Sequence, residues 1–273
     1  MNTLNTFILN NEALIRITFF VSIIFIMFFL EVFIPQRKLK IKKQKRWFSN
    51  FLLVFLGSFL VKLFLPFAAI GAAILAYEKN IGLFSYLELP YFLEILLSVV
   101  LLDLLIYFQH RYFHKNTFFW KFHKVHHSDM DYDLSTALRF HPVEILFSMI
   151  IKIAAILILG APLLAVFIFE IILSSLAVFN HSNIRLNKSF DKYLRFLIVT
   201  PDMHRIHHSV HKEELNSNYG FNISFWDKIF SSYTAKPKDE YETMTIGLAN
   251  LQDKKQMTNI LSLLNLPFLS EKK

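Results

Sequence analysis

The sequence predicts an all-α integral membrane protein with about four to five transmembrane helices. Three observations support this fold class. Of the 273 residues, 54% are hydrophobic, and they form long runs rather than the periodic patterns of a soluble core. A short basic segment separates the first two runs. The chain also has 11 histidines, and they cluster beyond the ends of the apolar runs.

The first two apolar runs define the expected N-terminal helices. Residues 14–34 are long enough to span a bilayer and too long for a signal-peptide core, so we expect a retained helix. Residues 51–77 form the second run, where Lys62 and Pro66 predict a kink or a tilt. Residues 84–89 are expected to lie at the membrane interface.

Three further runs follow. Residues 91–109 predict a third helix. Residues 143–159 and 163–179 predict a hydrophobic hairpin that turns at the breaker cluster 160–162. Each arm is short for a full crossing, so a re-entrant hairpin is an alternative to two transmembrane helices.

Charge predicts the orientation. Residues 36–47 carry seven basic side chains and no acidic one, and they lie between two apolar runs, where the positive-inside rule places a cytoplasmic loop. Following the runs from that loop, every histidine falls on the cytoplasmic side. We therefore expect a multi-pass protein, in a bacterial inner membrane, with its histidines facing the cytoplasm. The formal charge of +8 is concentrated in this loop, so nucleic-acid binding is not expected.

The chain has no cysteine, which excludes disulfide scaffolds, thiolate zinc sites and cysteine-ligated iron–sulfur clusters. A metal would have to be held by nitrogen or oxygen. Most of the histidines lie in three boxes: HxxxH at His110 and His114, and HxxHH at His123, His126, His127 and again at His204, His207, His208. Positions i, i+3 and i+4 share one helical face, so each box presents its imidazoles toward one point. So many neutral imidazoles exceed the needs of one metal ion, which implies two.

Several groups near the boxes are candidates for orienting the ligands. Asp103 lies two helical turns before His110, and an acid inside an apolar helix is costly unless it is paired or functional. The other candidates lie beside the boxes: Asp131, Asp133, Asp202, His141 and His211. Separately, Lys152 and Glu170 on opposite hairpin arms are expected to pair as a structural contact.

The motifs resemble those of the fatty acid hydroxylase/sterol desaturase superfamily, in particular bacterial sterol-desaturase-like members. The resemblance covers roughly residues 95–235. It rests on Asp103, Tyr107, His110-Arg111, His114, His123-Lys124-Val125-His126-His127-Ser128, Thr136-Ala137-Leu138-Arg139, His141-Pro142, Glu144, Asn180-His181, Pro201-Asp202-Met203-His204-Arg205-Ile206-His207-His208, Asn218-Tyr219-Gly220 and Trp226-Asp227.

This resemblance implies a helical membrane fold whose cytoplasmic cap holds two metal ions, presumed iron, with zinc as a possible substitute. Some relatives have a second histidine four residues after the position of His181, where this chain has Arg185. His141 or a water could fill that place, or the metal could stay open for O2. The catalytic ligand set that it implies is His110, His114, His123, His126, His127, His181, His204, His207 and His208.

The domain organisation follows from these assignments. Residues 1–90 are expected to hold the N-terminal transmembrane helices and the basic loop. Residues 91–235 are expected to form the catalytic domain, with the hairpin at 143–179 inside it. Residues 236–273 are expected to form a cytoplasmic tail, with an amphipathic surface helix after about residue 248.

The expected function is O2-dependent hydroxylation or desaturation of a lipid in the bilayer, which could be a fatty acyl chain, a sterol-like polycycle, an ether lipid or a carotenoid. The oxidant would come from the metal centre, since no side chain breaks an unactivated C–H bond. The sequence has no flavin or nicotinamide fingerprint, so electrons are expected from a ferredoxin, a reductase or a cytochrome b5-like donor.

Two alternatives belong to other classes. A histidine-ligated zinc hydrolase would need an open metal position and a carboxylate base, for which Glu144 or Asp202 could serve. A bis-histidine haem electron carrier would use paired histidines, but adjacent pairs such as His126-His127 are hard to explain in that way. A metal transporter would instead want its ligands along a pore at membrane depth.

Overall fold

The structure is a computed structural model that describes residues 3–269, and the part of the chain that it describes is helical, with isolated β-bridges and no named strand. The helices are α1 (Thr3–Phe33), α2 (Lys43–Phe64), α3 (Ala68–Lys79), α4 (Phe84–Leu87), α5 (Tyr91–Lys115), α6 (Thr117–His127), η1 (Leu134–Leu138), α7 (Pro142–Leu159), α8 (Leu163–Asn180), α9 (Lys188–Leu194), α10 (Pro201–His207), α11 (Lys212–Leu215), α12 (Phe225–Ile229), η2 (Gln256–Thr258), α13 (Ile260–Asn265) and η3 (Leu266–Phe268).

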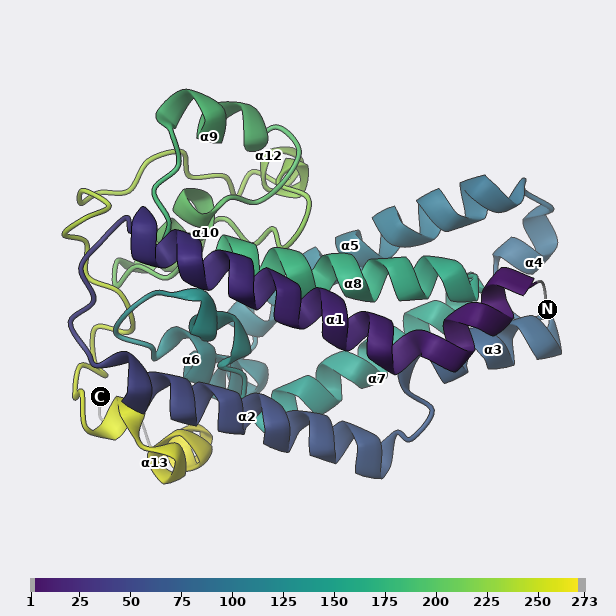
Figure 1. The fold of residues 1–273 in the computed structure, drawn as a ribbon, viewed down its shortest axis with the longest axis horizontal. Coiled ribbons are helices and arrows are strands. Elements are labelled where there is room, and N and C mark those ends of the chain that lie inside the picture. Colours follow the sequence, from purple (N-terminus) through teal and green to yellow (C-terminus); the bar gives the residue numbers. More distant parts are fainter. Residues whose placement is uncertain (1–2, 270–273) are drawn as a thin grey trace.

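Long helices form a bundle, and short helices cover one end of it. In Figure 1, α6, α9, α10, α12 and α13 lie at the left end, whereas α3, α4 and the N-terminus lie at the right. Five helical segments are long and apolar enough to cross a membrane. Large apolar side chains such as Phe25 and Phe55 are exposed along the bundle, as expected for surfaces that face lipid. The chain is thus a multi-pass membrane protein with a helical cap, and the predicted all-α membrane fold is confirmed.

The second apolar run is broken rather than continuous. α2 ends at Phe64 and α3 begins at Ala68, so the break falls at Pro66, as the sequence predicted. Proline has no N–H to donate to the preceding turn, and its ring clashes with the carbonyl four residues before it. Both α2 and α3 pack against α7.

The predicted hairpin is confirmed as α7 and α8. Gly160 ends α7 with a φ of +68°, a left-handed conformation that favours glycine. Pro142 occupies the first turn of α7, where its missing N–H has no partner to lose. At the same end, His141 Nδ1 accepts a hydrogen bond from the Val143 N–H and caps the helix.

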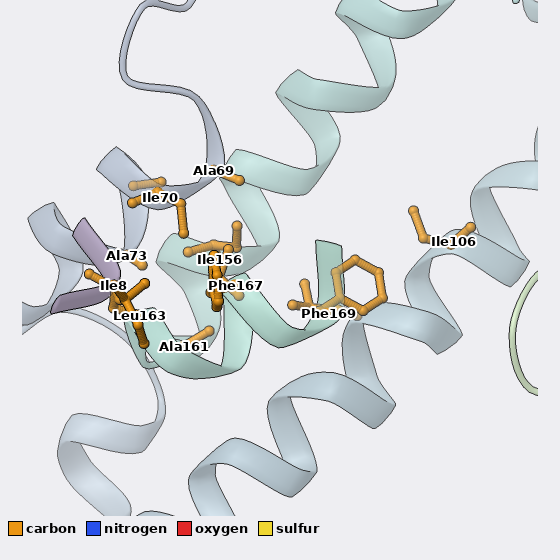
Figure 2. Packing of buried hydrophobic residues seen from close by; sticks show 13 residues of the cluster. Ile8, Ala69, Ile70, Ala73, Ile106, Ile156, Ala161, Leu163, Phe167 and Phe169 are labelled. Atoms are coloured by element: carbon orange, nitrogen blue, oxygen red, sulfur yellow. The ribbon is translucent and has the colours of Figure 1, made fainter. Parts of the chain in front are cut away.

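The apolar core lies where the hairpin meets α1, α3 and α5. Its buried members include Ile8, Ile70, Ile156 and Phe169, and Figure 2 shows these side chains gathered between the helices. The expected ion pair is present in this region: Lys152 Nζ lies 2.8 Å from Glu170 Oε1. Glu170 also contacts Arg16 at 2.6 Å, which the sequence did not predict. The pair therefore ties α1, α7 and α8 together.

The basic loop lies at the same end of the bundle as the cap. Backbone N–H groups of Lys40 and Ile41 donate to Asp131 Oδ2 at 2.8 and 2.7 Å. At the start of α2, Arg46 is fully buried between Asp129 and Asp133, with distances of 2.8 Å to each. These contacts join the loop to the segment that follows the second histidine box.

The C-terminal segment is not one long surface helix. It forms the short elements η2, α13 and η3, and buried Leu263 and Leu266 pack against Leu53 of α2 and Val125 of α6. The expected amphipathic helix is therefore replaced by a compact segment docked on the cap. Residues 270–273 of the predicted tail lie outside the described residues.

Candidate metal centre

Four elements bring nine histidines to the junction of bundle and cap. His110 and His114 lie in the last turns of α5, and His181 caps the end of α8. The HxxHH boxes lie on α6 and α10, with His208 directly after the latter. Thus the bundle supplies three of these imidazoles and the cap supplies six.

Local sequence explains why the two short helices begin where they do. Asn116 Oδ1 accepts hydrogen bonds from the N–H groups of Phe118 and Phe119, which starts α6 directly after α5. Thr200 Oγ1 accepts from the Met203 N–H, and Pro201 fills the first position of α10. These caps fix the direction in which each box faces.

The nine side chains form two groups, and within each group the ligand atoms lie within 4.8 Å of one another. The five-histidine group is His110, His114, His123, His127 and His207. The four-histidine group is His126, His181, His204 and His208. The helical spacing i, i+3, i+4 alone did not predict this division, in which each HxxHH box contributes to both groups.

The tautomers indicate that cations belong between the rings. Nδ1 of His110 lies 2.8 Å from the carbonyl of Tyr219, and Nδ1 of His207 lies 2.7 Å from that of Ser217. A carbonyl only accepts, so each Nδ1 carries the proton and each Nε2 is bare in the neutral ring. Yet the two Nε2 atoms lie 3.0 Å apart. Two bare nitrogens repel at that distance unless a cation lies between them.

The nitrogen spacing also bears on coordination geometry. In the four-histidine group, Nε2 of His181 lies 3.2 Å from Nε2 of both His126 and His204. With metal–nitrogen bonds of about 2.0–2.1 Å, such separations correspond to N–metal–N angles of about 99–106°. These angles are close to the tetrahedral value of about 109°, so the spacing suits a histidine-ligated metal ion but does not select its coordination number.

Burial keeps the imidazoles neutral, as ligands must be. Burial lowers the pKa of His123 and of His181 to about 3. It also lowers the pKa values of His126, His127, His204, His207 and His208 well below the ordinary value, and neighbouring imidazoles add to the shift. Hence the donor set offers neutral nitrogen, which suits iron, copper, nickel and zinc.

One carboxylate orients a candidate ligand, and it was not among the predicted orienting groups. Glu144 Oε1 lies 2.6 Å from His123 Nδ1, and both side chains are buried. This contact fixes the tautomer of His123 and directs its Nε2 to the metal position. The sequence signal was an acid in the first turn of the apolar helix α7. His181 Nδ1 is fixed in a similar way, at 2.8 Å from the Ala177 carbonyl.

The predicted orienting groups lie elsewhere. Within the described residues, no hydrogen bond or ion pair joins any of them to one of the nine histidines. Asp103 accepts a hydrogen bond from Trp226 Nε1, and Asp131 accepts hydrogen bonds from backbone N–H groups of the basic loop. Asp133 accepts from Arg46 and Trp47, and Asp202 pairs with Arg205. His141 caps α7 and contacts the Leu264 carbonyl, and His211 contacts Asp239. Both ring nitrogens of His141 thus contact backbone groups, and His141 is in neither histidine group.

Aromatic side chains surround the centre. Phe140 stacks on His126 with ring centroids 4.3 Å apart. Trp120 lies against His114 at 5.1 Å, and Tyr132 lies against His208 at 5.2 Å. Such rings limit the access of water and lower the local dielectric constant around the ligands.

A cavity of about 180 Å³ opens beside the histidines and extends between α5, α7 and α8. His110 and His123 of the five-histidine group and His126 of the four-histidine group all line it. Its other lining residues are mostly apolar, and Lys152 lies at its membrane side. A ligand in this cavity would touch both histidine groups.

Comparisons with known proteins place these motifs in context. The profile of the fatty acid hydroxylase family matches residues 95–232. An ornithine lipid hydroxylase, OlsE, of Rhizobium tropici is 28% identical over 55% of this chain and 44% of its own length. Alkylglycerol monooxygenases of Homo sapiens and Danio rerio are 31% and 32% identical, over 53% and 55% of this chain and 30% and 33% of theirs. The chain therefore aligns with less than half of each relative, and no solved structure matches it.

Proposed function

The chain belongs to the fatty acid hydroxylase family, and from this we propose that it is a membrane-bound di-iron oxygenase that hydroxylates a lipid with O2 and external electrons. The observation that carries the proposal is the cavity that touches both histidine groups and extends between membrane-spanning helices. A lipid chain in that cavity would lie beside the metals without leaving the bilayer.

The histidines have the role of holding the metals. His110, His114, His123, His127 and His207 would hold one ion, and His126, His181, His204 and His208 the other. Two iron ions there would supply the O2-derived oxidant that an unactivated C–H bond requires. The protein contributes positioning and exclusion of water: Glu144 and backbone carbonyls orient the ligands, while Phe140 and the apolar cavity wall direct the chain.

Two separate observations argue against the two rival functions. Nε2 atoms separated by 3.0–3.2 Å leave no room for a porphyrin between them, which disfavours a haem carrier. A zinc hydrolase needs a free carboxylate base, but Glu144 contacts His123 and Asp202 pairs with Arg205. The relatives are named as a hydroxylase of ornithine lipid and monooxygenases of alkylglycerol. These names favour hydroxylation over desaturation.

We place the catalytic unit at residues 91–235, with the metal side in the cytoplasm, because the basic loop and the cap lie at the same end of the bundle. In a bacterium this would be the inner membrane. A separate donor such as a ferredoxin, a reductase or a cytochrome b5-like protein would deliver electrons. His114 is the partly exposed member of the nine histidines, and Trp120 lies against it. We therefore expect the donor to approach there.

Metal analysis and lipid analysis together test the proposal. Protein purified in detergent after iron-supplied expression should contain about two irons per chain by mass spectrometry of metals. Cells that express it should gain a lipid heavier by one oxygen, and cells that express His126→Ala should not. Two zincs in place of iron would refute the oxygenase if the purified protein, reloaded anaerobically with iron and then given O2 and a reductant, still forms no oxygenated lipid. A haem absorption band would refute it as well.

A further inference from the structure

The cavity beside the metal centre is apolar except for a few side chains. Apart from the histidines, its polar lining residues are Gln109, Glu144, Ser148 and Lys152. Glu144 contacts His123, and Lys152 pairs with Glu170. The remaining two, from α5 and α7, are partly buried and contact each other across the cavity wall.

The side-chain amide of Gln109 has a hydrogen-bond partner for its nitrogen but none for its oxygen. Its Nε2 donates to Ser148 Oγ at 2.9 Å. Its Oε1 is buried and has no hydrogen-bond partner. A buried acceptor without a partner is costly, and in a native protein it calls for an explanation such as a missing ligand. Because Ser148 fixes the amide nitrogen, the amide oxygen is held in place to accept a bond from something else.

The position of this pair relates it to the reacting carbon. Gln109 directly precedes His110, and Ser148 lies one helical turn, about 6 Å, beyond Glu144 on the same face of α7. Lys152 lies a further turn along that face. A group bound by the amide would therefore lie close to the metal ligands, with the rest of a chain free to extend along the cavity.

The size of the cavity restricts the substrate further. A cavity of about 150 Å³ binds benzene, and this one is about 180 Å³. It suits a stretch of a single hydrocarbon chain, and four fused rings would not fit without repacking. Among the lipid classes that the sequence left open, this favours an acyl or alkyl chain over a sterol-like polycycle.

Resting on the proposed function, we propose that Gln109, held by Ser148, binds a hydrogen-bond donor of the substrate, so that the enzyme takes single-chain lipids with an O–H or amide N–H near the oxidised carbon. Amide-linked acyl lipids and lipids with a free hydroxyl beside the chain meet this requirement. Plain hydrocarbons and simple esters offer no donor at that position. Gln109 acts as a specificity residue that positions the chain.

Binding of three matched probes tests the inference without turnover. Native mass spectrometry of the purified, metal-loaded protein, without O2 or reductant, would compare hexadecanamide, methyl hexadecanoate and hexadecane. The wild type should bind hexadecanamide about tenfold more tightly than the ester, the factor expected for one hydrogen bond to a buried acceptor. Gln109→Leu should remove this preference, and Ser148→Ala should weaken it because the amide can then rotate.

A buried hydroxyl on the same helix supplies the control. Ser98 is buried in α5 and does not line the cavity, so Ser98→Ala should keep the preference for the amide probe. Equal binding of the three probes by the wild type, or a preference for the ester, would overturn the inference. So would a preference that survives in Gln109→Leu. If that variant does not fold, the test rests on the preference of the wild type for the amide probe and on the weakening of that preference in Ser148→Ala. None of these outcomes depends on iron content or product, which test the oxygenase separately.

Discussion

The imidazoles of His110 and His207 face each other through Nε2 atoms 3.0 Å apart, and Nδ1 of each ring donates to a backbone carbonyl. Residues 97 positions apart in the chain are thus held with two bare nitrogens in contact. This arrangement is unfavourable without a cation, because neither ring has a proton to share and burial disfavours a charged ring. The metal position is built into the hydrogen bonding of the apoprotein.

The division of the histidines into two groups predicts selective metal loss. His207→Ala should remove the ion of the five-histidine group and leave the other, so metal content should fall from about two to about one per chain. His204→Ala should do the same for the four-histidine group. Combining the two substitutions should remove both ions. Mass spectrometry of metals on each purified variant measures this, and loss of both ions in a single variant would show that the two sites are not independent.

Glu144 should control the affinity of one metal site without being a ligand. Its carboxylate orients His123 at 2.6 Å, and loss of such a partner costs about 10–100-fold in metal affinity. Glu144→Ala should therefore weaken the five-histidine site by that factor and spare the four-histidine site. Glu144→Gln, which can still accept from Nδ1, should recover most of the affinity. Competition with a chelator measures it, and equal affinities in wild type and Glu144→Ala would contradict the role.

The sequence predicted the bundle and the boxes because both depend on local spacing. The hairpin turn at Gly160 and the break at Pro66 were visible for the same reason. The orienting groups depend on tertiary contacts, and the residues predicted for that role form hydrogen bonds and ion pairs with other partners. Asp103 does share a face with His110, but seven residues separate them by about 10.5 Å along the helix. Its carboxylate instead reaches Trp226, 2.7 Å away.

The contacts that do orient the ligands come from segments without a motif of their own. The carbonyls of Ser217 and Tyr219 act through the path of the backbone after α11, which side-chain identity does not encode. Glu144 was visible as an acid in an apolar helix, but its partner depends on how α6 packs against α7. The division into five and four histidines likewise depends on how α6 and α10 face each other.

Acid should destabilise the protein from near-neutral pH downward. The pKa values of His123 and His181 are about 3 in the folded protein, against about 6.5 in an unfolded chain. The unfolded state therefore binds more protons below about pH 6.5. The free energy of unfolding is then unaffected by these two histidines above that pH, and it decreases as the pH falls toward about 3. Protons also compete with the metals. Thermal unfolding in detergent should show a Tm that falls steadily from about pH 6.5 to about pH 4, and a constant Tm would contradict this.

The buried cluster around Arg46 should be a major source of stability beside the metal centre. Arg46 is fully buried and lies 2.8 Å from both Asp129 and Asp133. These two aspartates follow the second histidine box in the sequence. Burial alone would raise the pKa of Asp129, but the charges of Arg46 and Arg139 outweigh it and hold the pKa below the usual range. Arg46→Met would leave two buried carboxylates without this partner. Removing one member of a buried pair costs about 3–5 kcal/mol.

The neighbouring Lys45 provides a matched control, because its side chain is exposed at the same end of α2. Equilibrium unfolding in mixed detergent should show the large loss of free energy for Arg46→Met and less than about 0.5 kcal/mol for Lys45→Met. Since Asp129 follows His127 by two residues, Arg46→Met should also loosen α6 and reduce metal retention. Similar stabilities of the two variants would mean that water enters the cluster and screens the carboxylates, and the buried pair would then not hold this part of the cap.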